Sequence, residues 1–480
     1  MLFNSSEFLF GFLPVVFIVF LLLGQFKNKY FATGWLAIAS ILFYVWDDPV
    51  RLLPIIVASV SVNYSLGCLL GRRRSPWVLT IGIFANLILL GWYKYAAFLL
   101  TVLVKVTDTP IPVPAIVLPI GISFFTFTQI AFLVDSYRGE AREYNPLHYC
   151  LFVTFFPHLI AGPIIHHKEI MPQFARDDTY QFSLGNFNLG IGWFSLGLIK
   201  KVLLADSVAP YASNVFSSAD QGNTLSFADA WLGVLSYTLQ IYFDFSGYSD
   251  MAIGLALIFG IVFPLNFNSP YKATSLIDFW TRWHMTLSRF LRDYLYFPLG
   301  GNRKGSTRRY FNLMITMLLG GLWHGAAWTF IIWGGLHGLG LIVNHAWRAV
   351  SRPNGWMLPL PLCNFLTLGF VTMAWVPFRA ADFDGMLRLW KSMINLRGLS
   401  GSFGESSVST WQVGWIAALL AIALLTPNTQ ELIEGSALRS LRPSSRIRFV
   451  GWTILTGTAF GIAVSLIVYR HPSEFLYFKF

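Results

Sequence analysis

The sequence contains little charge. Only 12% of its 480 residues are Asp, Glu, Lys or Arg, about half the share typical of soluble domains, whereas 55% are hydrophobic. This composition excludes an ordinary soluble protein and indicates an integral membrane protein. The net charge of +11 does not predict a nucleic-acid partner, because basic residues in a membrane protein first of all set its topology.

Cysteine is scarce, and several catalytic motifs are missing. The three cysteines form no CxxC pair and no disulfide framework, so we expect no redox chemistry and no metal site. The cysteines are Cys68, Cys150 and Cys363. The sequence also lacks GxSxG, Walker A and HExxH motifs, so it carries no signal for serine-hydrolase, ATP-driven or zinc-protease chemistry.

Long apolar runs dominate the sequence. A bilayer crossing takes about 20 apolar residues, and about twelve runs meet that requirement. They lie at 7–24, 31–47, 52–70, 77–100, 113–135, 187–205, 228–260, 313–329, 331–347, 362–379, 412–427 and 449–469. The run at 149–165 is broken by Pro157 and by AGP at 161–163, which predicts a re-entrant segment. No small-residue cleavage site follows the first run, so we expect a retained helix there.

Basic clusters predict the orientation of these spans. With the N-terminus outside, short basic segments such as 27–29, 72–74 and 348–352 fall on the cytoplasmic side, as the positive-inside rule requires. Lys200 and Lys201 do not fit, because they would lie near the outer end of their span. They would have to snorkel to the interface, unless the boundary of that span is shifted.

Two polar segments interrupt the apolar runs. Residues 262–312 are too many for a plain connection, and charged and aromatic residues alternate there at helical spacing. This pattern predicts amphipathic helices at the cytoplasmic face. Residues 381–410 are expected to form a polar external loop. We expect one membrane domain, 1–480, with core motifs at 118–350 and peripheral helices at 362–480.

Two histidines are the candidate catalytic residues. His324 lies in GGLWHG, inside an apolar run, where an ionisable side chain is costly and indicates function. The alternative is a structural histidine satisfied by a carbonyl or hydroxyl. A dry environment favours neutral imidazole, the usual general base near pH 7. His284 lies in the amphipathic segment, 40 residues earlier. His337 and His345, on the next run, are expected to act mainly in packing.

Two further clusters have plainer interpretations. Asp244 and Asp250 lie in an apolar span and could form the ion site of a transporter. More simply, they pair with Arg or Lys of the cytoplasmic segment, or cap a broken helix. His166 and His167 are adjacent, so they do not face one metal ion as an i,i+4 pair would.

A basic cluster surrounds His284. It consists of Arg282, Arg289, Arg292, Arg303, Lys304, Arg308 and Arg309. The plain interpretation is a topology signal that also binds anionic membrane lipid. The sharper one is a cytoplasmic dock in which guanidinium groups bind the phosphate oxygens of a phosphorylated donor.

The histidine motifs resemble those of a known family. FWTRWHMTLSRFLRDYLYFPLGGNRKG (279–305) and GGLWHGAAWTFIIWGGLHG (320–338) resemble the membrane-bound O-acyltransferase (MBOAT) family, above all its bacterial alginate O-acetyltransferase branch. LPIGISFFTFTQIAFLVDSYRG (118–139), FFPHLIAGPII and YFDFSGYSDMAIG resemble the same branch. The resemblance extends over nearly the whole chain, to about residue 380.

The resemblance implies a fold and an activity. The fold is all-α and polytopic, with re-entrant and amphipathic helices around a central tunnel, in a bacterial inner membrane. The catalytic residue is His324 at the tunnel's core, assisted by His284. The donor is acetyl-coenzyme A or another acyl donor, a substrate rather than a permanent cofactor. The partners are periplasmic polysaccharide acetyltransferase subunits, and the expected polymer is alginate, with cellulose or another envelope acceptor as alternatives.

The residues suit direct transfer of the acyl group. His324 would take a proton from an acceptor hydroxyl attacking the thioester. His284, protonated or as an N–H donor, would orient the thioester or stabilise the oxyanion. The coenzyme's phosphates would be held by Arg282, Arg289 and Lys304. Water would be excluded from the tunnel by Trp283 and Trp323. A transient acetyl-histidine is a variant of this mechanism.

Other functions remain open on these residues. An ion-coupled transporter or flippase would use Asp244 and Asp250, although no inverted repeat is visible. Within the family, D-alanyl or fatty acyl transfer is possible, and a long acyl chain would need a deep apolar slot beside His324. A non-enzymatic scaffold for polysaccharide secretion is the third alternative.

Overall fold

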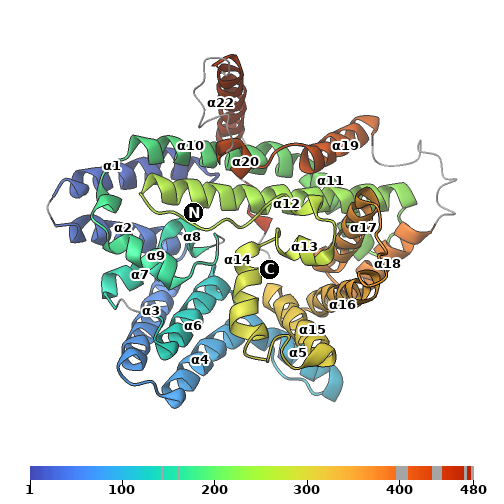
Figure 1. Ribbon diagram of the computed structural model, residues 1–480, viewed down its shortest axis with the longest axis horizontal. Helices are drawn as coiled ribbons and strands as arrows, with labels where there is room; N and C mark the ends of the chain where they lie inside the picture. Colours follow the sequence, from blue (N-terminus) through green and yellow to red (C-terminus); the bar gives the residue numbers. More distant parts are fainter. Residues whose placement is uncertain are drawn as a thin grey trace. The chain divides into compact units, whose positions relative to one another are not determined.

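The computed structural model is built of helices (Figure 1). It describes residues 1–26, 28–141, 144–160, 162–395, 409–434, 446–469 and 473–476. Within these ranges no strand occurs, which confirms the all-α prediction. The chain forms two compact units, and α12 (Phe227–Ile258) contributes to both. The first unit comprises 1–198, 248–265 and the described residues from 454 onward; the second comprises 199–247 and the described residues of 266–453. The prediction of one membrane domain stays a prediction.

The first unit is formed mainly by the N-terminal helices. In the labels used here, η marks short π- or 3-10-helical turns. Its elements are η1 (Glu7–Phe12), α1 (Leu13–Gly24), α2 (Tyr30–Val45), α3 (Pro49–Arg72), α4 (Pro76–Leu90), η2 (Gly91–Tyr95), α5 (Ala96–Thr107), α6 (Ile122–Arg138), α7 (Pro146–Thr154), α8 (Phe156–Leu159), α9 (His167–Ala175), η3 (Asp178–Tyr180), α10 (Leu184–Ile199) and the end of α22 (Arg446–Tyr469). Helices α3 and α4 are joined by two buried amides, because Asn63 and Asn86 exchange hydrogen bonds of 3.2 and 2.6 Å.

The predicted span at 113–135 is wrong in its first part. Helix α6 begins only at Ile122, and the described backbone from 108 to 119 is irregular. Four prolines lie in this stretch: Pro110, Pro112, Pro114 and Pro119. Proline has no backbone N–H and disfavours helix at the residue before it, so an apolar composition cannot make this stretch helical. The run at 149–165 is broken as predicted, because α7 ends at Thr154 and α8 is a separate turn.

The second unit contains both candidate histidines. Its elements are η4 (Lys200–Ala205), α11 (Asp206–Asp220), η5 (Pro270–Lys272), α13 (Leu276–Trp280), α14 (Met285–Leu291), η6 (Arg292–Tyr296), α15 (Gly305–His324), α16 (Trp328–Ser351), α17 (Leu360–Arg379), α18 (Phe383–Ile394), α19 (Thr410–Leu425) and α20 (Thr429–Glu434). Helices α15 and α16 lie side by side (Figure 1). Their close approach depends on glycine, because a Cβ on Gly321 or Gly334 would collide with the backbone of the facing helix.

Of the two predicted polar segments, one forms helices as predicted and the other differs in part from its prediction. The segment 262–312 forms short helices, α13, α14 and η6, in agreement with its helical spacing. The predicted loop at 381–410 is wrong where α18 lies. Asp382 caps this helix by accepting a 2.7 Å hydrogen bond from the Gly385 amide, and Met386 and Leu389 are buried three residues apart. The rest of that loop, 396–408, lies outside the described residues.

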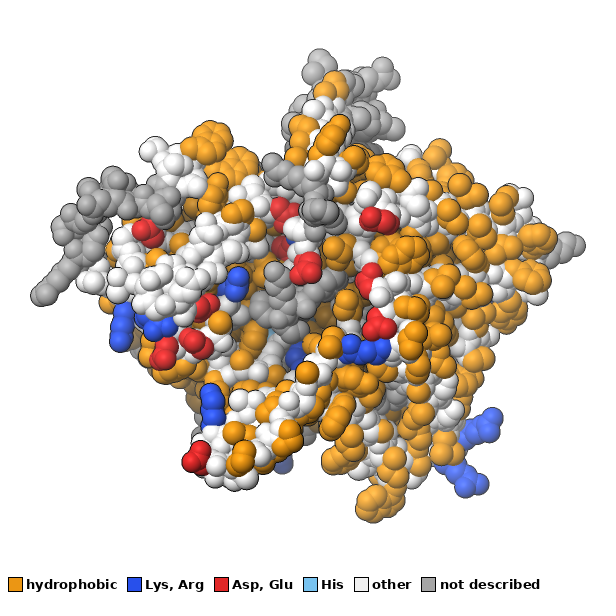
Figure 2. Space-filling model, turned by 180° about the vertical axis from the view of Figure 1, so that it is seen from behind, with side chains coloured by type: hydrophobic (Ala, Val, Ile, Leu, Met, Phe, Trp, Pro, Cys, Tyr) orange, Lys and Arg blue, Asp and Glu red, His pale blue; other side chains and the backbone are white. Residues whose placement is uncertain are grey.

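The helices expose a large apolar surface, visible as the orange side chains in Figure 2. Trp77 is 76% exposed and Val50 is 86% exposed, which suits side chains that face lipid. Within the part of the chain that the structure describes, five helical stretches are long and apolar enough to cross a membrane. These are Glu7–Gly24, Pro49–Arg72, Pro76–Thr107, Leu184–Asp220 and Leu360–Arg379. Three shorter apolar helices are Tyr30–Val45, Thr410–Leu425 and Gly457–Tyr469. The count of about twelve crossings stays a prediction.

A buried ion pair explains the lysine that does not fit the topology. Lys201 Nζ lies 2.7 Å from Asp244 Oδ1 and 2.9 Å from Asp206 Oδ1, and the side chains of Lys201 and Asp244 are both 2% exposed. Lys201 therefore does not snorkel to an interface. Asp244 has a basic partner, as the plainer interpretation requires, but the partner comes from η4 and not from the segment 262–312. The ion pair with Lys201 therefore gives Asp244 a structural role between α12 and η4.

Replacing Lys201 by methionine should destabilise the protein, because removal of this partner leaves the buried Asp244 carboxylate uncompensated. The cost of breaking such a pair is about 3–5 kcal/mol. Adding Asp244→Asn should restore part of the lost stability, because it removes one stranded charge. Thermal unfolding in detergent measures both effects, with Lys200→Met as the matched control. A Lys201→Met protein as stable as the control would contradict this assignment.

Candidate active site

His324 is the last residue of α15 and is buried among aromatic rings. Its ring centroid lies 4.8 Å from that of Trp323, 5.0 Å from Trp333 and 5.1 Å from Phe378. These neighbours come from α15, α16 and α17, so three helices form an aromatic box around the imidazole. The chain leaves α15 through Gly325, where a Cβ would collide with the ring of Phe330. Glycine is therefore required next to the candidate catalytic histidine.

His284 is fully buried and has a left-handed backbone, with φ of 43°. Such a conformation is costly for a residue other than glycine and often marks a functional position. Two backbone hydrogen bonds of 2.9 Å hold it, one from the Asn268 amide to the Arg282 carbonyl and one from the Met285 amide to the Asn266 carbonyl. The segment before η5 therefore pairs with both sides of His284 and turns its side chain inward.

The side chain of Asn266 determines which nitrogen of His284 carries the proton. Its Oδ1 accepts from the Thr286 hydroxyl at 2.9 Å and from the Thr286 amide at 3.3 Å. A backbone amide only donates, so the Asn266 atom is the carbonyl oxygen. His284 Nδ1 lies 3.1 Å from the same oxygen and must therefore donate to it.

The protonation state of His284 follows from its burial. Loss of hydration lowers the pKa of His284 to about 3, because the charged ring is disfavoured in a dry environment. At neutral pH the ring is neutral, with its proton on Nδ1 and a lone pair on Nε2. The N–H expected for orienting the thioester is thus directed at Asn266, and what Nε2 offers to a substrate is a lone pair.

The two candidate tryptophans differ in their positions. Trp323 contacts both histidines, with its ring centroid 4.8 Å from that of His324 and 6.2 Å from that of His284. Trp283 packs in a dense aromatic core, 4.9 Å from Trp375. The structure thus brings His284, Trp323 and His324 together, whereas Trp283 supports the loop behind them. Their role in excluding water stays a prediction.

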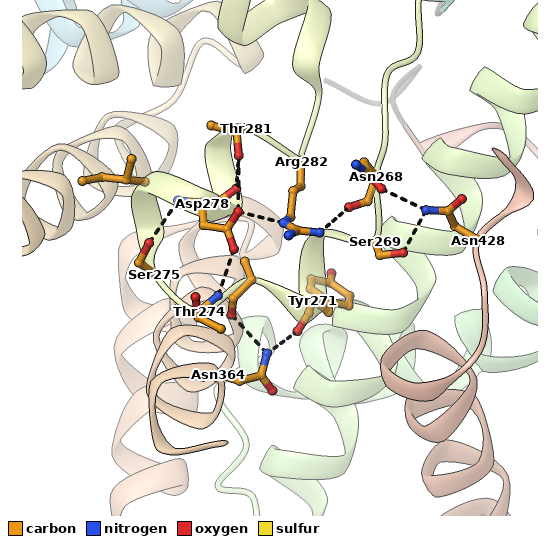
Figure 3. Close-up of polar contacts among 12 residues, drawn as sticks. Asn268, Ser269, Tyr271, Thr274, Ser275, Asp278, Thr281, Arg282, Asn364 and Asn428 are labelled. Atoms are coloured by element: carbon orange, nitrogen blue, oxygen red, sulfur yellow. Dashed lines mark hydrogen bonds and ion pairs between the residues drawn. The ribbon is translucent and has the colours of Figure 1, made fainter. Parts of the chain in front are cut away.

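Arg282, the candidate phosphate ligand beside His284, already has protein partners (Figure 3). Its Nε donates to Asp278 Oδ1 at 2.8 Å, and one terminal nitrogen donates to the Asn268 carbonyl at 3.3 Å. Asn268 is held in turn by Asn428, whose amide donates at 3.0 Å to Asn268 Oδ1 and to Ser269 Oγ. This network fixes the segment that pairs with His284.

The other predicted side chains are distributed as follows. Arg289 lies on α14 and is partly buried, while Lys304 is exposed before the start of α15. Their binding of coenzyme phosphates stays a prediction. Asp250 is buried in the first unit. His167 is buried and its Nδ1 lies 3.1 Å from Asp135 Oδ2.

Sequence reasoning missed the residues that position His284. Asn266, Asp278 and Asn428 belong to no motif, and Asn428 lies 144 residues beyond His284. The one available signal is the clustering of amides and hydroxyls at 266–269, in the sequence NFNS. Such residues are typical of segments that hydrogen-bond outside regular helices.

The site is thus a pair of buried histidines in an apolar helical body. A family model, MBOAT, membrane-bound O-acyltransferase family, matches residues 92–379. The chain is 44% identical to a peptidoglycan O-acetyltransferase of Helicobacter pylori, over 83% of this chain and 81% of that protein. It is 41% identical to a "probable alginate O-acetylase AlgI" of Pseudomonas aeruginosa, over 86% and 76%. It is 27% identical to a teichoic acid D-alanyltransferase of Streptococcus thermophilus, over 77% and 92%.

The chain belongs to the membrane-bound O-acyltransferase family. This confirms the resemblance carried by the RWH and WHG motifs. The chain is therefore a membrane acyltransferase, and an acyl donor is one of its substrates.

The Arg282 network predicts how an Arg282→Gln variant behaves. If the guanidinium positions His284, the variant should lose mainly kcat, because the reacting groups are misplaced while donor binding is retained. Steady-state acyl transfer at several donor concentrations separates the two constants. A raised KM with normal kcat would instead support the role of Arg282 in binding phosphate.

The low pKa of His284 predicts a pH profile. His284 stays neutral throughout an assay from about pH 5 to 9, so it cannot produce the acidic limb of the kcat profile. His284→Asn should lower kcat and leave the midpoint of that limb unchanged. Measurement of kcat against pH for both proteins tests this, and a shifted or absent limb in the variant would show that His284 titrates.

Proposed function

We propose that this chain is an O-acetyltransferase of a bacterial inner membrane. It takes acetyl groups from acetyl-coenzyme A on the cytoplasmic side and passes them across the membrane for O-acetylation of an exopolysaccharide, with alginate as the acceptor polymer. The observation that carries this proposal is that His284 and His324 both contact the ring of Trp323. The alginate and peptidoglycan relatives support an acetyl group and a cell-envelope polysaccharide.

The geometry supports His324 as the general base. The aromatic box limits water around its imidazole, which reduces competing hydrolysis of a thioester. As the acceptor hydroxyl attacks the donor carbonyl, its proton passes to His324, which then returns the proton to the departing thiolate. His284 Nε2 accepts a hydrogen bond from the acceptor sugar or from the hydroxyl of an intermediate carrier and thereby orients it.

The donor and the later partners follow from the direction of transfer. Arg289 and Lys304 are proposed to bind the coenzyme's phosphates, because they belong to the basic cluster around His284 in the sequence and their charge suits phosphate oxygens. Periplasmic acetyltransferase subunits are proposed to receive the acetyl group. The acceptor polymer lies outside the membrane, so the acetyl group must be passed on from the membrane enzyme to reach it. Anionic membrane lipid is a further proposed partner of the exposed basic residues.

Peptidoglycan is a second candidate acceptor. The H. pylori relative carries that activity in its printed name and is 44% identical over most of both chains. The transferred group is the same, and the difference lies in the periplasmic partner. Reconstitution with each partner and each polymer distinguishes the two acceptors.

Replacing His324 by alanine should abolish acetyl transfer, because no other group takes the hydroxyl proton. The assay uses purified protein in proteoliposomes, labelled acetyl-coenzyme A and a periplasmic partner with its polysaccharide. His345→Ala is the matched control, since His345 lies on the next helix, α16, outside the aromatic box, and it should keep normal turnover. Normal transfer by His324→Ala would refute the proposed base. Turnover absent from the wild-type protein with acetyl-coenzyme A, and present with another acyl donor, would refute the proposed donor.

A further inference from the structure

A third buried histidine lies near His324 and has no part in the mechanism above. His337 is in the middle of α16, four residues after Trp333, and is fully buried. Its ring lies 4.8 Å from that of Trp333, which in turn lies 5.0 Å from His324. One indole therefore contacts both imidazoles.

The tautomer of His337 is the reverse of that of His284. Trp280 Nε1 lies 3.3 Å from His337 Nδ1, and an indole nitrogen only donates. Nδ1 of His337 therefore accepts, and the proton of the neutral ring is on Nε2. Among the described residues, that Nε2 has no hydrogen-bond partner.

Trp333 presents a second donor of the same kind. Its Nε1 is buried and also lacks a hydrogen-bond partner within the described part of the chain. Residues four apart share one face of a helix, so Trp333 and His337 present two unmatched N–H groups from the same face of α16. Their other neighbours include Phe370, Trp375 and Phe378, whose rings offer no oxygen acceptor.

Unmatched buried donors are costly and rare, and they are expected where a bound molecule supplies the acceptor. We propose that His337 Nε2–H and Trp333 Nε1–H bind the carbonyl oxygen of the acyl thioester and stabilise the oxyanion formed during transfer. This inference rests on the proposed function, because it places the donor carbonyl next to His324. His284 cannot take this role in its neutral form, since its N–H is directed at Asn266.

The transfer forms one carbon–oxygen bond and breaks one carbon–sulfur bond. The acceptor oxygen bonds to the carbonyl carbon while its proton moves to His324, and the carbonyl π electrons move onto the oxygen held by the two N–H groups. The electron pair then returns to re-form the carbonyl, the carbon–sulfur bond breaks, and the thiolate takes the proton from His324. The products are the acetyl ester and the free thiol.

Three variants test the proposal. His337→Phe removes the N–H and keeps a ring, and His337→Gln keeps an amide N–H near the position of Nε2. Trp333→Phe removes the indole N–H together with one of the two fused rings. Loss of an oxyanion donor lowers kcat about 10²–10³-fold, which is the result expected for His337→Phe with little change in the donor KM. His337→Gln should recover a large part of that loss, and Trp333→Phe should also lower kcat.

The controls separate this role from packing and from the proposed function. Each variant is also compared by melting temperature in detergent, with His345→Phe as the matched control on α16. The proposal is wrong if His337→Phe keeps the kcat of the control per folded molecule, as it would if the N–H groups held only a structural water. It is equally wrong if the loss lies in KM, or if His337→Gln is no better than His337→Phe. Normal turnover by His324→Ala overturns the proposed function itself, and that result is independent of His337.

Discussion

The hydrogen bond between His284 Nδ1 and Asn266 Oδ1 is the contact on which the rest of the site depends. It is specific because the same oxygen also accepts two hydrogen bonds from Thr286, so the amide has one permitted orientation. That orientation fixes the tautomer of His284, while the two backbone hydrogen bonds from and to the segment 266–268 hold its left-handed conformation. Arg282, Asp278 and the distant Asn428 all act on the segment that carries Asn266.

The remaining buried polar groups need partners within the protein or from a substrate. In an apolar helical body every buried polar group needs a partner, because water is not there to replace one. Asn63 and Asn86 satisfy each other, and Lys201 satisfies Asp244. Several buried polar groups lack partners among the described residues, and the two N–H groups of α16 belong to the indole that contacts His324 and to the imidazole beside it, which is why we propose them as places for a substrate atom.

Sequence predicted much of the fold, because apolar runs at helical spacing have few other solutions. The prediction failed where a local interaction determines the secondary structure. Prolines prevent a helix at 108–119, and the Asp382 cap starts a helix within a predicted loop. His284 and His324 could be chosen as candidate catalytic residues from RWH and WHG, and this choice stays a prediction, whereas family membership is confirmed. The contact of both histidines with the ring of Trp323 could not be predicted, because spacing along the chain does not determine spatial contact. The tautomers depend on Asn266 and Trp280, and no motif marks these as partners.

The most direct test of this account is to determine which ring nitrogen carries the proton in His284 and in His337. Nitrogen-15 NMR of histidine-labelled protein in lipid nanodiscs distinguishes Nδ1–H from Nε2–H, and His284→Asn and His337→Gln assign the signals. At neutral pH the account predicts His284 with its proton on Nδ1 and His337 with its proton on Nε2, both rings uncharged. His284 protonated on Nε2 or on both nitrogens would contradict the central claim, because His284 would then be the donor and the N–H groups of α16 would not be needed to hold the oxyanion.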